Sequence, residues 1–246
     1  MTIKNNILKN LDNFDLFQNF YENSKSPILN KFQNFPKYAR RQVVSRFVAL
    51  YEIFKLQLNI KGSIVDCGVH EGMSLMTFAQ FSTILEPYNY HRKIIGFDTF
   101  SGFPNLSVKD KKNKISKKNG FQPNYDSYED FKKSIEVFDN NRFLSNKIKI
   151  ELVKGDATQT IPLYLKKNKH LIISLLMIDF DIYKPCKVAL ENFISVMPKG
   201  SIIVFDELNN PDWPGETQAF LENKKIKYSK INCFEYEPNI SYIVIE

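Results

Sequence analysis

Five short apolar runs constrain the fold of this chain more than any other feature of its sequence. They are residues 63–67, 93–97, 147–153, 172–178 and 201–205. Helical patterns follow the first, third and fourth runs, so that strands and helices alternate along the chain. This alternation is typical of βαβ units, whose strands pair in parallel beneath covering helices. The sequence therefore predicts an α/β fold with a mostly parallel sheet.

The two ends of the chain have different patterns. Residues 1–60 are predicted to be helical, because residues 40–58 place apolar side chains at helical spacing and Gly62 follows them. Near the other end, residues 228–236 and 241–245 resemble strands joined by a turn at residues 237–239 (Glu-Pro-Asn), which predicts an antiparallel hairpin. We therefore expect a helical cap over residues 1–60 and one larger domain over residues 61–246.

Residues 105–146 separate the second strand-like run from the third and have no periodic apolar pattern. Six lysines and one aspartate lie within residues 109–118. A connection of this length is usually a lid or a solvated loop, so we expect a lid-like insertion here. Tyr125 and Tyr128 are candidates to help it close over a bound acceptor.

Composition narrows the class of protein. Apolar residues make up 43% and charged residues 25% of the chain, which is ordinary for a globular protein. No apolar stretch approaches the roughly 20 residues that span a bilayer, and residues 1–10 lack the apolar core of a signal peptide. We expect a cytoplasmic protein without a membrane partner. The net charge of +7 would suit an anionic partner, but the abundance of Lys, Asn, Ile and Phe is also the pattern of an A/T-rich genome.

Carboxylates follow two of the predicted strands directly. Asp179 comes after the run 172–178, and Asp206 and Glu207 come after the run 201–205. If these strands are parallel neighbours, their carboxyl ends lie only about 5 Å apart, at the edge where open α/β sheets bind ligands. Oxygen ligands of this kind suit a divalent cation. The sequence therefore predicts a metal site formed by Asp179, Asp206 and Glu207.

The first strand leads into a glycine turn, residues 68–72 (Gly-Val-His-Glu-Gly), with a helix expected from Ser74 onward. Glycines let a backbone turn tightly and approach a ligand, and the first N–H groups of a helix are unpaired. Asp98 ends the second strand, where a carboxylate can accept both hydroxyls of a ribose. These features favour an adenosine-type ligand.

The absence of a third glycine in this turn discriminates between the possible adenosine ligands. A dinucleotide fold would have a glycine where Ser74 stands, so that pyrophosphate binding is disfavoured. S-adenosylmethionine fits better, because it has no phosphate and its cationic groups suit acidic residues such as Asp66. The candidate donor-binding residues lie after the first four strands: Asp66, Gly68, Val69, Gly72, Ser74, Asp98, Ser101, Asp156, Ala157 and Asp179.

Five segments carry a resemblance to a known family. They are residues 68–72 (GVHEG), 86–89 (EPYN), 96–104 (GFDTFSGFP), 179–185 (DFDIYKP) and 205–216 (FDELNNPDWPGE). Over residues 62–220 the chain resembles the macrocin-type sugar O-methyltransferases, and within them the branch that methylates a TDP-rhamnose at its 3-hydroxyl. The resemblance implies a class I methyltransferase fold with a Rossmann-like sheet, S-adenosylmethionine as donor and a sugar hydroxyl as acceptor. It also implies a homo-oligomer and a magnesium ion on the carboxylates at Asp179, Asp206 and Glu207.

Methyl transfer needs an acceptor oxygen that is aligned with the donor methyl and relieved of its proton. We expect Asp179 to act as the base while it contacts the metal. Asp181 is a rival for either role, and a solvated helix cap is its alternative. His70 is a second candidate base, although it can equally orient donor or acceptor. Trp213 could stack on the apolar face of a sugar, or pack in the core.

Two other classes of function remain open. A nucleic-acid methyltransferase would use the positive charge, but residues 179–183 lack the Asn/Asp-Pro-Pro-aromatic pattern of base N-methylation. A non-catalytic protein with this fold would have little reason to place three carboxylates around a cation site. We therefore expect a sugar acceptor and no nucleic-acid partner.

Overall fold

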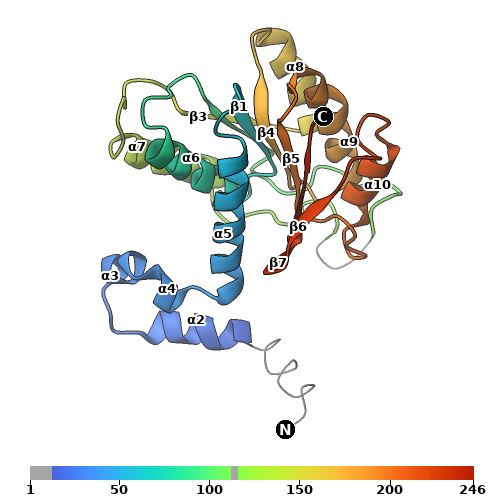
Figure 1. Ribbon diagram of the computed structural model, residues 1–246. Helices are drawn as coiled ribbons and strands as arrows, with labels where there is room; N and C mark the ends of the chain where they lie inside the picture. Colours follow the sequence, from blue (N-terminus) through green and yellow to red (C-terminus); the bar gives the residue numbers. More distant parts are fainter. Residues whose placement is uncertain (1–12, 112–115) are drawn as a thin grey trace. The chain divides into compact units, whose positions relative to one another are not determined.

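The computed structural model describes residues 13–111 and 116–246 (Figure 1). Contacts divide the chain into two compact units, with the boundary between Val48 and Ala49. The first unit contains α2 (Asn13–Asn23), α3 (Ile28–Gln33), α4 (Phe35–Tyr38) and the beginning of α5 (Arg41–Leu56). Within the described residues, no helix has the length and apolar character needed to cross a membrane.

The second unit is built on a sheet of seven strands in the order β3-β2-β1-β4-β5-β7-β6. The first five strands of the chain are parallel: β1 (Ser63–Cys67), β2 (Ile94–Asp98), β3 (Ile150–Lys154), β4 (Ile173–Ile178) and β5 (Ile202–Phe205). β7 (Glu237–Val244) pairs antiparallel to β5, and β6 (Asn232–Phe234) pairs antiparallel to β7. The structure thus confirms the α/β class, the five strands and the closing hairpin.

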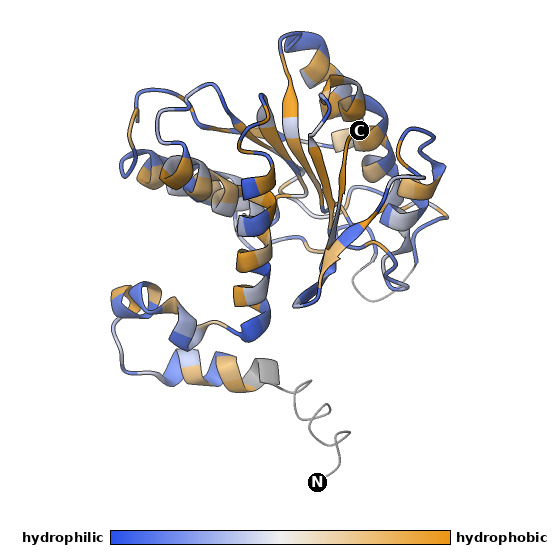
Figure 2. Cartoon of the chain, viewed as in Figure 1, coloured by the Kyte–Doolittle hydropathy of each residue, from blue (hydrophilic) through white to orange (hydrophobic). Residues whose placement is uncertain are grey.

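The central strands are mostly apolar because both faces of the sheet are covered. Every residue of β1, β4 and β5 is buried, and these strands are largely orange in Figure 2. On one face, α8 (Ala157–Lys167), α9 (Tyr183–Phe193) and α10 (Pro214–Glu222) contribute to a single apolar cluster with Phe97, Leu176 and Ile203. On the other face, Leu75 of α6 (Met73–Leu85) packs over Gly96 of β2.

Two details differ from expectation. The hairpin turn lies before Glu237, because Glu237 already pairs with Phe234. The predicted turn at residues 237–239 is therefore wrong: these residues belong to β7, and no partner on β6 pairs with residues 238–240, which form an irregularity in the ladder. The long connection after β2 also contains a helix that was not predicted, α7 (Ser127–Asp139). Asp126 begins it by accepting a hydrogen bond from the N–H of Glu129.

β4 and β5 are parallel neighbours, with Ile178 opposite Phe205. The residues that follow them, Asp179 and Asp206, therefore leave the sheet side by side, as the sequence predicted. The N–H of Asp206 donates to the carbonyl of Ile178, at 3.3 Å.

Candidate active site

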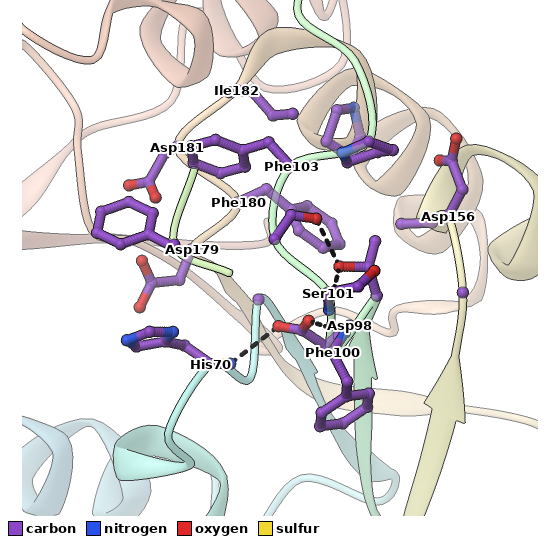
Figure 3. Close-up of a pocket in the computed structure, with 18 of the residues that line it drawn as sticks. His70, Asp98, Phe100, Ser101, Phe103, Asp156, Asp179, Phe180, Asp181 and Ile182 are labelled. Carbon is purple, nitrogen blue, oxygen red and sulfur yellow. Dashed lines mark hydrogen bonds between the residues drawn. The ribbon is translucent and has the colours of Figure 1, made fainter. Parts of the chain in front are cut away.

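A cavity of about 290 Å³ lies at the carboxyl ends of β1, β2, β4 and β5 (Figure 3). It contains most of the site residues predicted from the sequence: Gly68, His70, Asp98, Ser101, Asp156, Ala157, Asp179, Asp181, Asp206, Glu207 and Trp213. Four other predicted donor residues, Asp66, Val69, Gly72 and Ser74, are not among its lining residues. We call the part lined by Gly68, Asp98 and Ser101 the glycine-rich end of the cavity. The part lined by Asp179, Asp181, Asp206 and Glu207 is the acidic end.

The glycine turn brings the first strand close to the fourth. Gly68 has a φ of +101°, and a Cβ atom there would lie 1.9 Å from the carbonyl oxygen of Asp179. Only glycine allows this backbone conformation together with this approach. Gly72, the N-cap of α6, has a φ of +85°, and its missing side chain leaves room for the ring of Phe131. The turn is therefore fixed by contacts on both sides.

Asp98 holds the two loops that border the glycine-rich end. Its Oδ2 accepts a hydrogen bond from the N–H of His70 at 2.9 Å, and its Oδ1 accepts one from the N–H of Phe100 at 2.6 Å (Figure 3). A carboxylate has about four acceptor positions, so that two remain for a ligand's hydroxyl groups. The geometry is compatible with the predicted ribose contact.

Asp66 and Ser74 stabilise the glycine turn without lining the cavity. Asp66 is fully buried, and its Oδ2 accepts a hydrogen bond from the hydroxyl of Ser74 at 2.7 Å. This bond ties the end of β1 to the first turn of α6. Asp156 has a comparable local task, because its Oδ1 caps α8 by accepting from the N–H of Thr158 at 2.9 Å. Unlike Asp66, Asp156 also lines the cavity, together with Ala157.

The acidic end contains Asp179, Asp181, Asp206 and Glu207, which leave β4 and β5 together. Figure 3 shows the Asp179 carboxylate beside the His70 ring, with Asp181 further along the same loop. Within residues 13–111 and 116–246, no three His, Cys, Asp or Glu residues form a group that could hold a metal ion. The structure therefore brings the predicted ligands to one end of the cavity but does not arrange them as a closed metal site.

A further carboxyl group, Glu216, lies behind this end and was not predicted as a site residue. It is fully buried, and its Oε1 accepts a hydrogen bond from the N–H of Glu207 at 2.9 Å. Burial raises the pKa of Glu216 well above its usual value, and the neighbouring carboxylates of Asp206 and Asp181 raise it further. Burial thus favours the neutral form of Glu216, whose carboxyl group fixes the backbone at Glu207.

Three aromatic rings that contact one another, those of Phe103, Phe121 and Trp213, form part of the cavity wall. The Phe121 ring stacks on Trp213 at 5.8 Å, with 29° between the ring planes, and lies edge-on to Phe103 at 5.4 Å. It is 5.5 Å from the ring of His70. Trp213 therefore lines the cavity and does not pack in the core. This position is the one that stacking on a sugar would require. Phe121 was not predicted, because it lies in the connection after β2, where no pattern distinguishes it.

Backbone strain is concentrated around this cavity. Among the described non-glycine residues with positive φ, four line it: His70 (47°), Phe100 (55°), Phe121 (58°) and Asp181 (61°). Each such conformation costs about 1–3 kcal/mol and persists only where the surrounding structure enforces it, most often at functional sites. The strain supports the assignment of this cavity as the functional site.

The connection after β2 lines the cavity through Phe121, Pro123 and Ser127, and Tyr125 lies within this stretch. The hydroxyl of Tyr125 donates to the carboxylate of Glu71 at 2.6 Å, and this bond raises the pKa of Tyr125 to about 12. Tyr128 packs edge-on against Phe100. Both tyrosines thus contact the loops that form the glycine-rich end.

The chain is similar to a known methyltransferase family in sequence and in fold. The model of the macrocin O-methyltransferase (TylF) family matches residues 42–233. A crystal structure of CalS11, a calicheamicin methyltransferase, superposes with a TM-score of 0.90 at 30% identity, covering 96% of this chain and 92% of that one. The apo structure of CalS11, described as a TDP-rhamnose 3'-O-methyltransferase, gives 0.82 at 28% identity, with 96% and 94% covered.

A third solved structure shares the fold alone. The O-methyltransferase NovP superposes with a TM-score of 0.60 at 14% identity, covering 82% of this chain and 79% of that one. No curated protein matches the chain in sequence. The sheet order and these superpositions are those of a Rossmann-like methyltransferase.

Proposed function

Since the chain belongs to the macrocin O-methyltransferase family and is an S-adenosylmethionine-dependent O-methyltransferase, we propose that its acceptor is a hydroxyl group of a nucleotide sugar or of a glycosylated product. The observation that carries this proposal is the division of the cavity into a glycine-rich end, an acidic end and an aromatic wall. A sugar has hydroxyl groups that carboxylates can bind and an apolar C–H face that aromatic rings can contact. We also propose that the protein is cytoplasmic, as the sequence predicts.

The donor would occupy the glycine-rich end. Asp98 would accept hydrogen bonds from the ribose, and Asp156 with Ala157 would border the adenine. The turn at residues 68–72 and Ser101 would border the rest of the donor, and Asp179 would lie next to the sulfonium. The predicted donor residues that do not line the cavity would act indirectly, by holding this turn in place; they are Asp66, Val69 and Ser74.

The chemistry then depends on the acidic end. Asp179 is proposed to take the proton of the acceptor hydroxyl, because it lines the cavity next to the glycine turn and beside His70. His70 would orient the acceptor or, in the rival assignment, act as the base. Asp181, Phe121 and Trp213 would hold the sugar ring so that its oxygen faces the donor methyl.

A divalent ion, magnesium, is part of this proposal. Its ligands would be Asp179, Asp206 and Glu207, whose oxygens suit a hard cation. Magnesium is commonly held by one or two carboxylates with several waters, so that the donor set fits even though no described group of three residues surrounds one point. When bound, such an ion lowers the pKa of a hydroxyl group and fixes its position.

The proposed function is tested by a mass-spectrometric screen for methyl transfer. The purified protein is incubated with S-adenosylmethionine, magnesium and a panel of nucleotide sugars and glycosides. Addition of one methyl group to a sugar hydroxyl is the expected result. Donor binding without methylation of any sugar would contradict it, and methylation of RNA in a parallel reaction would favour the nucleic-acid alternative.

The donor assignment predicts a loss of affinity in Asp98→Ala. This change removes a charged hydrogen-bond partner of the ribose, which typically contributes about 1.5–3 kcal/mol, so that the Kd for S-adenosylmethionine should rise by roughly 10- to 150-fold. Calorimetry with Asp98→Ala and with a control in an exposed acid, Glu129→Ala, provides the measurement. Unchanged donor affinity in a folded Asp98→Ala protein would reject the ribose assignment.

We also propose that the protein is a homo-oligomer. Ile28, Leu29 and Phe32 of α3 are each about two-thirds exposed, at 67%, 66% and 67%. Neighbouring apolar side chains on one short helix are typical of a surface that another chain covers.

The oligomer proposal predicts the effect of charges on this surface. Wild-type protein should elute with a mass that is a multiple of 28.8 kDa, and Leu29→Glu with Phe32→Glu should lower that mass, because two buried charges would destabilise the interface. Light scattering after gel filtration gives the mass. Val137→Glu, on the exposed side of α7, is the control, and a monomeric wild type would contradict the proposal.

A further inference from the structure

Asp110 lies in the connection between β2 and α7, far from the acidic end in sequence, and yet it reaches the start of α9. It is buried, with 8% of its surface exposed. Its Oδ1 accepts a hydrogen bond from the N–H of Tyr183 at 2.7 Å, and its Oδ2 accepts one from the N–H of Ser107 at 2.7 Å. Asp110 therefore joins this connection to the loop that carries Asp179 and Asp181.

The bond to Tyr183 is a helix cap supplied by a distant residue. The N-cap of α9 is Ile182, which provides no capping side chain of its own. The Asp110 carboxylate takes that place at the N-terminus of the helix, where its negative charge is favourable. Just before this point the loop is tightly turned, since Asp181 has a φ of +61° and the N–H of Ile182 donates to the carbonyl of Phe180 at 2.6 Å.

The first turn of α10 contacts the same carboxylate. A Cβ atom on Gly215 would lie 2.4 Å from Oδ1 of Asp110 and 2.5 Å from the nitrogen of Tyr183. Gly215 immediately precedes Glu216, whose carboxyl group holds the N–H of Glu207. The Asp110 carboxylate is thus packed between the loop after β4 and the first turn of α10, whose Glu216 in turn holds the loop after β5.

Lys109 adds a second, more exposed connection at the same place. Its Nζ donates to the hydroxyl of Tyr183 at 2.9 Å and forms an ion pair with Glu222. The hydroxyl of Tyr183 donates to the carboxylate of Glu222 at 2.6 Å. Hydrogen bonds from Lys109 and Tyr183 together lower the pKa of Glu222 to about 2. Exposed ion pairs contribute little, so that the buried bonds of Asp110 carry most of the constraint.

We propose that Asp110 is a positioning residue for methyl transfer, which holds the two acidic loops in the arrangement that the acceptor needs. This inference rests on the proposed function, because the acidic end is the acceptor end only in that reaction. It assigns to the connection after β2 a direct part in the geometry of the reaction. Asp110 itself does not line the cavity.

Three variants test the inference by hydrogen exchange and kinetics. In Asp110→Ala, peptides that contain Tyr183 should exchange their amide hydrogens faster, because the N–H of Tyr183 loses its acceptor. The kcat should fall by about 10- to 100-fold, as expected when reacting groups shift by about 1 Å. The KM for S-adenosylmethionine should change less than about 3-fold. Asp110→Asn should be intermediate, since its amide oxygen still accepts from Tyr183 but its NH₂ group faces the N–H of Ser107.

The matched control is Lys111→Met, one residue along the same segment, which removes an exposed ion pair with Asp212. It should leave exchange and kinetics as in the wild type. If the wild type is active and Asp110→Ala leaves either amide exchange or kcat unchanged, the positioning role is rejected while the proposed function stands. If Asp110→Ala does not fold, the same comparison is made with Asp110→Asn. A wild type that methylates no sugar instead rejects the proposed function, and the positioning role with it.

Discussion

Asp179→Asn should lower kcat by about 10²- to 10⁴-fold, the usual contribution of a general base. The amide has nearly the shape of the carboxylate, so that the contact of the Asp179 backbone with Gly68 is preserved, but it cannot take up a proton. Donor affinity should change only a few-fold. Single-turnover methyl transfer, measured with donor affinity by calorimetry, separates the two effects.

Two further variants discriminate between the candidate bases. His70→Asn and Asp181→Asn should each cost less than Asp179→Asn, because they are proposed to orient the acceptor and not to accept its proton. If His70→Asn instead abolishes transfer and Asp179→Asn remains active, the base is His70. Equal and small losses in all three variants would show that the acceptor loses its proton to none of them.

Chelation of divalent ions should stop methyl transfer and leave donor binding intact. This result is expected because the proposed ligands, Asp179, Asp206 and Glu207, lie at the acidic end of the cavity and not at Asp98. Asp206→Ala should reproduce the separation, with metal affinity reduced by at least ~10-fold, the smaller loss seen when only a supporting group is removed. The measurement is turnover in EDTA, followed by titration with magnesium, calcium and manganese.

The matched control for this experiment is Asp212→Ala. Asp212 is an exposed carboxylate in the same loop, paired with Lys111, and its loss should alter neither metal dependence nor turnover. Full activity in EDTA, or in Asp206→Ala, would show that the strand-end carboxylates do not form a catalytic metal site.

The sheet could be predicted from the sequence because its central strands are buried on both faces and are therefore mostly apolar. The same pattern located the carboxylates, since Asp179 and Asp206 interrupt apolar runs at the ends of neighbouring strands. The closing hairpin was recognised in the same way, but its turn was misplaced because Pro238 resembles a turn residue. In the structure Pro238 lies in a stretch of β7 that has no partner on β6.

Residues whose role depends on tertiary contacts could not be predicted. Asp110 is one acid among six lysines, and only the folded chain brings it to Tyr183. Phe121 lies in a polar segment, and its ring acquires a role only through Trp213 and His70. α7 had a sequence signal that was passed over, namely Asp126 and Glu129 at capping spacing before Phe131.

The contact between Gly68 and the carbonyl of Asp179 has a consequence for how the two substrates bind. These two loops approach so closely that a single methyl group would not fit between them. A donor that shifts the glycine turn on binding would therefore also shift Asp179, the proposed base. By thermodynamic linkage, any factor by which the donor strengthens acceptor binding is the factor by which the acceptor strengthens donor binding. Donor binding and acceptor binding in such an enzyme would be coupled through the backbone contact between Gly68 and Asp179.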